Sequence, residues 1–266
     1  MADPAVGDAP TASAPQPMLA TVACGALVAL MAAAGPWPMI LVALPVLVAV
    51  AVVGRRHAVP ELGDAAAVVG LLYCFAVLPL VSVWPIAPGL ALVATAVLLR
   101  ARGQLGRWRA WLRLGRVDRT SIGMVVAVQV VSVAALLTWT RLFDGELTAV
   151  YADAARDAGP LLAGVGGVLF LVVNGLVEDS LFFGVLLSAA SRTLPTWAAL
   201  ALSATVFGLA HLHGIPNGAV GVLMAGAWAV LLAGLRLRTG GMLATYAAHV
   251  VADATIVAML LPAVFA

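Results

Sequence analysis

Long apolar runs recur along almost the whole chain of 266 residues, and they constrain its fold more than any other feature. A membrane-crossing helix needs about 20 consecutive apolar residues. Lipid offers no partners for backbone N–H and C=O groups, so each crossing is expected to be a helix. The run 86–99 is short for a crossing, which leaves the number of spans at eight or nine. The sequence therefore predicts an all-α, polytopic transmembrane bundle whose apolar segments are 18–34, 38–53, 65–84, 86–99, 121–140, 160–190, 195–212, 217–235 and 241–264.

The composition excludes an ordinary soluble domain. Hydrophobic residues make up 64% of the chain and charged residues 10%, with a mean hydropathy of +1.10, whereas soluble domains carry about 25% charged residues. The basic residues are all arginine, and together with abundant Ala, Val and Gly this indicates a GC-rich, bacterial coding sequence. We expect a multi-pass protein of the plasma membrane that contacts lipid and binds no nucleic acid. The sequence does not indicate its oligomeric state.

Polar segments divide the chain into a short tail and two groups of helices. Residues 1–17 lack the basic region of a signal peptide and are expected to be a disordered tail. The N-terminal transmembrane helices of 18–140 precede the connection 141–159, and the helices of 160–264 follow it. The basic segment 100–120 interleaves arginine with tryptophan and leucine, which fits either an interfacial helix on an anionic leaflet or an ordinary loop.

The arginines predict how the bundle is oriented in the membrane. They follow the second, fourth, sixth and eighth apolar segments, and the positive-inside rule places these connections in the cytoplasm. The connection 141–159 contains more acidic residues than arginines and is expected on the outer side.

Ionisable side chains inside the apolar segments are confined to the last third of the chain. A charged side chain at mid-bilayer costs roughly 2.5–3.5 kcal/mol, so such a group is a candidate for function. The candidates are Glu178, Asp179, His211, His249 and Asp253. The last two are four residues apart, so on a helix the carboxylate can hold the imidazole. His211 is preferred to the histidine two positions later, which lies nearer the membrane surface.

Acids and imidazoles on three helices can serve hydrolysis if they share one interior. A carboxylate can take a proton from water while an imidazole orients the water or stabilises an oxyanion. Alternatively, Glu178, His211 and His249 could hold a zinc ion and leave one position for water, although the His-Glu-x-x-His signature of zinc proteases is absent. Two further interpretations remain. The polar residues could form hydrogen bonds that only join the helices, or they could form a proton relay.

Three motifs lie in these apolar segments in the order typical of one protease family. They are Glu178-Asp179-Ser180-Leu181-Phe182-Phe183, Phe207-Gly208-Leu209-Ala210-His211 and His249-Val250-Val251-Ala252-Asp253. Over residues 174–256 the chain resembles the CPBP family, whose eukaryotic members are the type II CAAX prenyl proteases and whose motifs are Glu-Glu-x-x-x-Arg, Phe-x-x-x-His and His-x-x-x-Asn/Asp.

The resemblance implies an intramembrane endopeptidase on a helical bundle. In it Glu178 would activate water beside His211, while His249 and Asp253 would stabilise the oxyanion or hold a metal. The substrate would be a membrane-associated peptide or protein, cut near the cytoplasmic membrane face. Because the composition indicates a bacterial chain, a peptide without a prenyl group is the preferred substrate.

Two positions depart from the family's first motif. Asp179 replaces the second Glu, and Phe183 replaces the Arg that would lie one helical turn away and neutralise this acid. Asp179 then needs another cation, and Arg192 is one candidate. The alternative is a catalytically inactive membrane scaffold or chaperone that has kept the fold.

Overall fold

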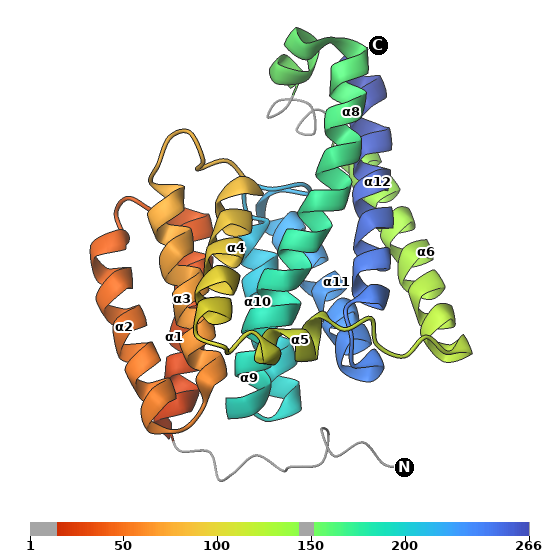
Figure 1. Ribbon diagram of the computed structural model, residues 1–266. Helices are drawn as coiled ribbons and strands as arrows, with labels where there is room; N and C mark the ends of the chain where they lie inside the picture. The colour runs from red at the N-terminus through yellow and green to blue at the C-terminus, as the bar shows by residue number, and fades with distance from the viewer. Residues whose placement is uncertain (1–14, 144–151, 266) are drawn as a thin grey trace.

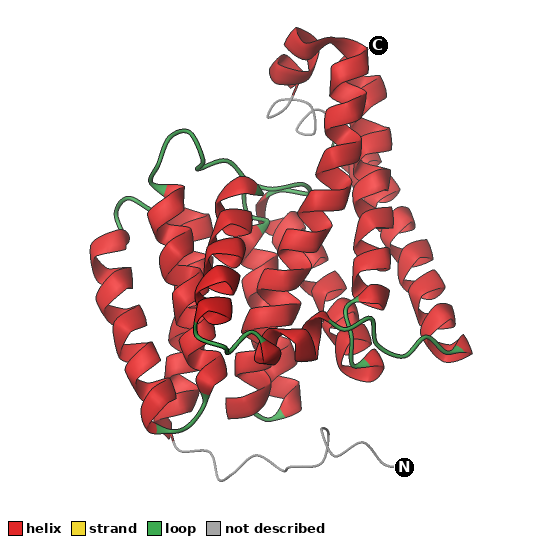
Figure 2. Ribbon diagram, in the orientation of Figure 1, coloured by secondary structure: helices red, strands yellow, loops and turns green. Residues whose placement is uncertain are grey.

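The computed structural model describes residues 15–143 and 152–265, and this part of the chain consists of helices and loops without strands (Figure 2). The prediction of an all-α fold is confirmed. Its elements are α1 (Pro15–Ala34), α2 (Ile40–Arg56), α3 (Pro60–Ala76), α4 (Ile86–Ala101), α5 (Gly106–Leu112), α6 (Arg119–Leu142), α8 (Ala152–Glu178), the π-helix η1 (Asp179–Leu186), α9 (Leu187–Thr193), α10 (Thr196–Ala210), α11 (Gly218–Thr239) and α12 (Leu243–Phe265).

The expected number of eight or nine spans is not confirmed. Among the described residues, five helical stretches are long and apolar enough to cross a membrane: Pro15–Ala34, Arg119–Leu142, Arg156–Thr193, Gly218–Thr239 and Leu243–Leu261. The helices α4 and α10 are apolar but contain only 16 and 15 residues. At 1.5 Å per residue they measure about 22–24 Å, less than the roughly 30 Å of a hydrocarbon core.

The helices form two groups (Figure 1), and η1 contacts helices of both. The helices α1 to α4 pack beside one another, and α10 lies between α1 and α11. On the other side, α12 packs against both α6 and α8. These three helices extend beyond the rest of the bundle at one end, where the C-terminus lies (Figure 1).

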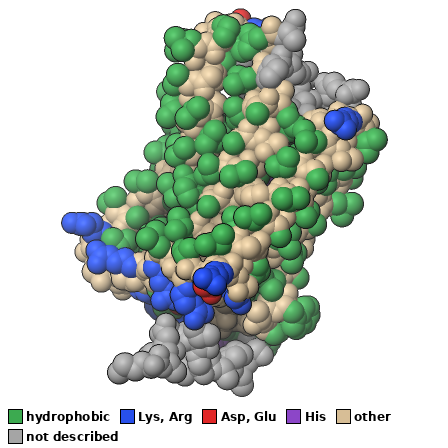
Figure 3. All heavy atoms as spheres, turned by 90° about the vertical axis from the view of Figure 1, so that its right-hand side faces the viewer, with side chains coloured by type: hydrophobic (Ala, Val, Ile, Leu, Met, Phe, Trp, Pro, Cys, Tyr) green, Lys and Arg blue, Asp and Glu red, His purple; other side chains and the backbone are tan. Residues whose placement is uncertain are grey.

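The two ends of the bundle differ in charge. Arginines end α2, α4, α9 and α11 and recur through the α4–α6 connection, and they gather at the lower end of the molecule in Figure 3. We call this end the arginine end. The loops α1–α2, α3–α4 and α10–α11 lie at the opposite end of the bundle (Figure 1). A broad hydrophobic surface lies between the two ends, as expected for a protein surrounded by lipid (Figure 3).

The helix α5 lies at the arginine end, within the predicted basic segment. Arg107 forms an ion pair of 2.7 Å with the buried Asp64 of α3, and this hydrogen-bonded carboxylate raises the pKa of Arg107. The indole of Trp108 donates to the same carboxylate at 3.1 Å. Trp108 and Trp111 are both buried. These tryptophans therefore pack against protein, whereas the interfacial interpretation had them facing a leaflet.

An extended connection at the arginine end fixes the start of α12. The amide of Arg116 donates to the carbonyl of Thr239 at 2.8 Å, and that of Met242 donates to the carbonyl of Arg113 at 2.9 Å. Gly115 has φ of +85° and lies so close to Gly241 that neither residue has room for a Cβ. Two glycines are thus required where these backbones cross, just before the helix that carries the last motif.

The helix α1 begins at Pro15, so the boundary expected at residue 17 lies inside a helix. The rest of the predicted tail, residues 1–14, lies outside the described residues, as does the part 144–151 of the predicted acidic connection.

Candidate active site

The first motif lies where a long helix changes its winding. The chain runs from α8 through η1 into α9 without a break, and Asp179 is the first residue of the π-helical part. The hydroxyl of Ser203 on α10 donates to the carbonyl of Phe182 at 3.0 Å. A Cβ at Gly184 would lie 2.7 Å from the ring of Trp111. Insertions of this kind frequently lie at functional sites because they redirect side chains within a helix.

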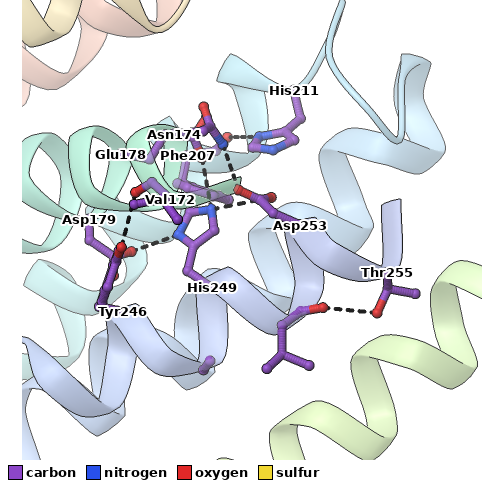
Figure 4. A network of polar contacts seen from close by, with 12 residues as sticks. Val172, Asn174, Glu178, Asp179, Phe207, His211, Tyr246, His249, Asp253 and Thr255 are labelled. Atoms are coloured by element: carbon purple, nitrogen blue, oxygen red, sulfur yellow. Dashed lines mark hydrogen bonds and ion pairs between the residues drawn. The ribbon is translucent and has the colours of Figure 1, made fainter. Parts of the chain in front are cut away.

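His249 of α12 lies between acidic side chains of the first motif and of its own helix (Figure 4). Its Nδ1 is 2.8 Å from Oδ1 of Asp179. Its Nε2 is 3.3 Å from Oε2 of Glu178 and 3.8 Å from Oδ1 of Asp253, four residues further along α12. All four side chains are buried. The structure thus brings together four of the five residues singled out in the sequence.

Two further residues connect the acids. The amide Nδ2 of Asn174 donates to Oδ2 of Asp253 at 3.0 Å. The indole Nε1 of Trp84, in the α3–α4 loop, lies 2.9 Å from both Oδ1 of Asn174 and Oε1 of Glu178 and donates to them. Oε2 of Glu178 has no hydrogen-bond partner among the described residues. Trp84 therefore holds one oxygen of this carboxylate, and the other faces Nε2 of His249 at 3.3 Å.

Trp84 was not among the residues predicted for the site. The sequence shows it only as a tryptophan before a proline, more than 90 residues away from Glu178. Asn174 has a clearer signal, because it lies one helical turn before Glu178. A buried carboxylate requires hydrogen-bond donors, but spacing along the chain cannot identify a donor from a distant loop.

His211 lies at the edge of the cluster. It ends α10, and its Nδ1 is 2.9 Å from the carbonyl of Phe207. The rings of His211 and Phe207 are 4.6 Å apart. Figure 4 shows the imidazole of His211 apart from that of His249, at the upper right of the view and above Asp253. His211 therefore belongs to the same site but makes no hydrogen bond to the acids among the described residues.

A single cavity of about 1230 Å³ joins these groups. Its wall includes Glu178, His211, His249 and Asp253, whereas Asp179 lies behind His249 and does not line it. His213 also lines the cavity, although the sequence favoured only one of the two neighbouring histidines. Most of the remaining wall is apolar and comes from α1, α6, α8, α11 and α12.

Trp228 of α11 packs against the catalytic candidates from one side. Its ring meets that of His249 edge-on, with centroids 4.9 Å apart and planes at 89°. Its Nε1 is buried without a hydrogen-bond partner among the described residues, and the side chain lines the cavity. Trp228 thus brings a free donor to the site that spacing did not predict.

The partner of Asp179 in the structure is His249, not the arginine suggested from the sequence. Arg192 pairs with Glu61 at 3.3 Å, at the surface, so the suggestion that it neutralises Asp179 is wrong. His249 occupies the position beside this acid. Phe183, at the family's Arg position, is fully buried and stacks on Phe207 with centroids 5.6 Å apart. A histidine from another helix therefore partners the acid that the missing Arg would have neutralised.

The donors in the cavity do not fit the zinc set considered from the sequence. Among the residues that the structure describes, no three of His, Cys, Asp and Glu are arranged to share one metal ion. Both ring nitrogens of His249 face carboxylates, Nδ1 towards Asp179 and Nε2 towards Glu178. A metal ligand needs one nitrogen directed at the ion. The zinc site stays a prediction, and no catalytic step is derived through it.

The cavity extends away from the arginine end. Its wall includes residues of all three loops at the opposite end: Trp37 of α1–α2, Trp84 of α3–α4 and His213 of α10–α11. If the arginine end is cytoplasmic, the cavity opens towards the outer side. The expectations of cytoplasmic arginines and of cleavage near the cytoplasmic face therefore do not agree with each other in this geometry, and both stay predictions.

Comparison with known proteins agrees with the geometry. Residues 160–255 match the family model described as type II CAAX prenyl endopeptidase Rce1-like. This match confirms the resemblance to the CPBP, CAAX-protease-like family, and it covers α8 from Pro160 through most of α12. No curated protein and no solved structure matches the chain. The family and the apolar helices indicate a multi-pass membrane protein and support a CAAX-type membrane endopeptidase in general.

Proposed function

We propose that this protein is an intramembrane endopeptidase of the bacterial plasma membrane in which Glu178 activates a water molecule. One observation carries the proposal. Glu178 lines a large apolar cavity, Trp84 donates to its Oε1, and its Oε2 has no hydrogen-bond partner among the described residues and lies 3.3 Å from Nε2 of His249. A carboxylate that is fixed by a donor and faces a cavity is suited to general-base catalysis. The preferred substrate is a membrane-associated peptide or protein without a prenyl group.

The reaction begins with proton transfer from water to Oε2 of Glu178. The water oxygen forms a bond to the scissile carbonyl carbon, and the carbonyl oxygen becomes an oxyanion. Glu178 then returns the proton to the amide nitrogen as the C–N bond breaks, which yields a carboxylic acid and an amine. The protein is thus unchanged at the end of each turnover.

The remaining polar groups orient the cluster and stabilise the oxyanion. An ionised carboxylate only accepts hydrogen bonds, so Nδ1 of His249 donates to Asp179, which fixes the ring. We assign Nε1 of Trp228 as a group that can donate to the oxyanion, since an indole N–H is always a donor and the side chain lines the cavity. His249 and His211 also line the cavity, but Nδ1 of each ring already donates, to Asp179 and to the carbonyl of Phe207, so their Nε2 atoms can donate only in the doubly protonated form of the ring. Asp253, held by Asn174, keeps His249 oriented from the other side.

A catalytically inactive membrane scaffold is the second candidate. The observation in its favour is Phe183, which replaces the motif arginine and is packed into an aromatic cluster. The two functions differ in what a change at Glu178 does. An inactive scaffold keeps its partner binding and cellular phenotype when Glu178 is replaced.

Glu178→Gln in purified, reconstituted protein tests the proposal. Gln keeps the size and can still accept from Trp84 but cannot take a proton, so turnover should fall by about 10²–10⁴-fold. Glu61→Gln is the matched control, because Glu61 pairs with Arg192 at the surface and lies outside the cavity. Peptidase activity that survives Glu178→Gln at the level of the control would refute the assignment.

A further inference from the structure

The open side of the cavity is formed by the loops farthest from the arginines. Trp37, Ser82, His213 and Pro216 line it and come from three different connections. Each connection lies at the end of the bundle opposite the arginine end (Figure 1). We call these residues and their loops the mouth loops.

The arginine distribution indicates which side of the membrane the mouth loops face. All arginines of the chain except Arg141 and Arg156 lie at or near the arginine end, in the last turns of helices and in the α4–α6 connection. Ion pairs join the elements of this end, as between Arg192 and Glu61 and between Arg238 and Asp118. The positive-inside rule makes it cytoplasmic. The mouth loops then face the non-cytoplasmic side.

The lengths of the helices indicate how deep the mouth loops lie. The helix α10 starts near the arginine end, after Arg192, and ends at Ala210, before the α10–α11 loop. Its 15 residues span about 22 Å, whereas the hydrocarbon core is roughly 30 Å thick. The helix α6 has 24 residues and extends further in the same direction (Figure 1). The mouth loops therefore lie in the outer leaflet, near its interface with water.

The chemistry of the mouth loops agrees with this depth. The loops 35–39, 77–85 and 211–217 contain no Asp, Glu, Lys or Arg. Instead they expose apolar side chains, with Trp37 69% and Leu80 93% exposed. Tryptophan is enriched at the membrane interface because its ring is amphipathic. Such a rim suits an apolar segment that arrives through lipid and disfavours a charged, water-soluble peptide.

We propose that the cavity takes a membrane-inserted apolar peptide segment from the non-cytoplasmic leaflet and that its scissile bond lies in the outer half of the bilayer. The cleavage rests on the proposed function, whereas the side on which the mouth loops open does not. The site would act on the part of the segment that lies on the far side of the membrane from the arginines.

Labelling of single cysteines tests the side directly. Cys74 is replaced by alanine, while Cys24 is fully buried and stays. Ser82→Cys and His213→Cys report on the mouth loops, and Arg102→Cys reports on the arginine end. A membrane-impermeant maleimide is added to right-side-out and inside-out vesicles. Both loop cysteines should react in right-side-out vesicles alone, and the Arg102 position in inside-out vesicles alone.

Labelling of the loop cysteines from the same side as the Arg102 position, or from neither side, would overturn the proposal. A Leu-Ala transmembrane peptide co-reconstituted with the protein tests where cleavage occurs. Mass spectrometry should place the cut in its outer half, and a cut in its cytoplasmic half would overturn the proposal. Absence of any cut would count against the peptidase function, while the labelling result still decides the orientation.

Discussion

His249 and Asp179 lie 2.8 Å apart, Nδ1 to Oδ1, and their side chains are 2% and 1% exposed. They come from helices α12 and η1, 70 residues apart in the chain. Asp179 lies outside the cavity wall, so its effect on chemistry must pass through the imidazole. It acts as a positioning residue for His249.

Asp179→Asn should therefore lower kcat with little change in KM. An amide can donate to Nδ1 as well as accept from it, so the ring loses its single preferred tautomer. We expect a fall in kcat of roughly 10²-fold, the lower end of the range for acid–base groups. Steady-state kinetics on reconstituted protein measure it, with Glu61→Gln as the control. A change confined to KM would contradict the positioning role.

Trp84→Phe should lower kcat because Glu178 loses the donor that holds Oε1. Removal of one hydrogen bond to a charged group costs about 1.5–3 kcal/mol, so we expect a decrease of roughly 10- to 100-fold. Trp197→Phe is the control, since Trp197 is largely exposed and lies outside the cavity wall. Equal kinetics for the two variants, with equal thermal stability, would show that the indole N–H of Trp84 does not matter.

Treatment with a zinc chelator should leave peptidase activity unchanged. The expectation follows from His249, whose nitrogens already face Asp179 and Glu178. The measurement compares activity before and after incubation with 1,10-phenanthroline and determines the zinc content of the protein. Loss of activity that added zinc restores would establish the metal alternative.

Phe183→Arg should destabilise the protein even though arginine is the family's residue at this position. The site is fully buried against Phe207, and His249 already partners Asp179. An uncompensated buried charge costs about 3–5 kcal/mol. Thermal unfolding in detergent should show a lowered Tm for Phe183→Arg and a smaller change for Phe183→Leu. Higher stability and higher activity of Phe183→Arg would indicate that an arginine still fits beside Asp179.

The sequence predicted those features that depend on local patterns. Apolar runs predicted the helices, and the spacing of His249 and Asp253 predicted that both would face one interior. The five ionisable candidates lie at one site because buried charge is too costly to be scattered in lipid.

Features that depend on distant parts of the chain were not predictable. Trp84 reaches Glu178 from a loop of the N-terminal half, and Arg192 pairs with Glu61 although a buried acid was expected to attract it. The number of spans is not confirmed, because hydropathy alone does not show where a helix ends short of the membrane surface. The π-helical winding at Asp179 likewise depends on packing against α5 and α10.

The backbone pairing of Arg113–Arg116 with the start of α12 means that the family-matched segment is not self-contained. Residues 160–255 contain the acids and imidazoles. However, the indole that donates to Glu178 and the backbone segment that fixes the start of α12 both lie upstream of residue 160. A fragment that begins at Pro160 would carry every motif residue and lack the scaffold that aligns them. A peptide that contains only the three motifs should therefore have the motif residues without the geometry that aligns them for catalysis.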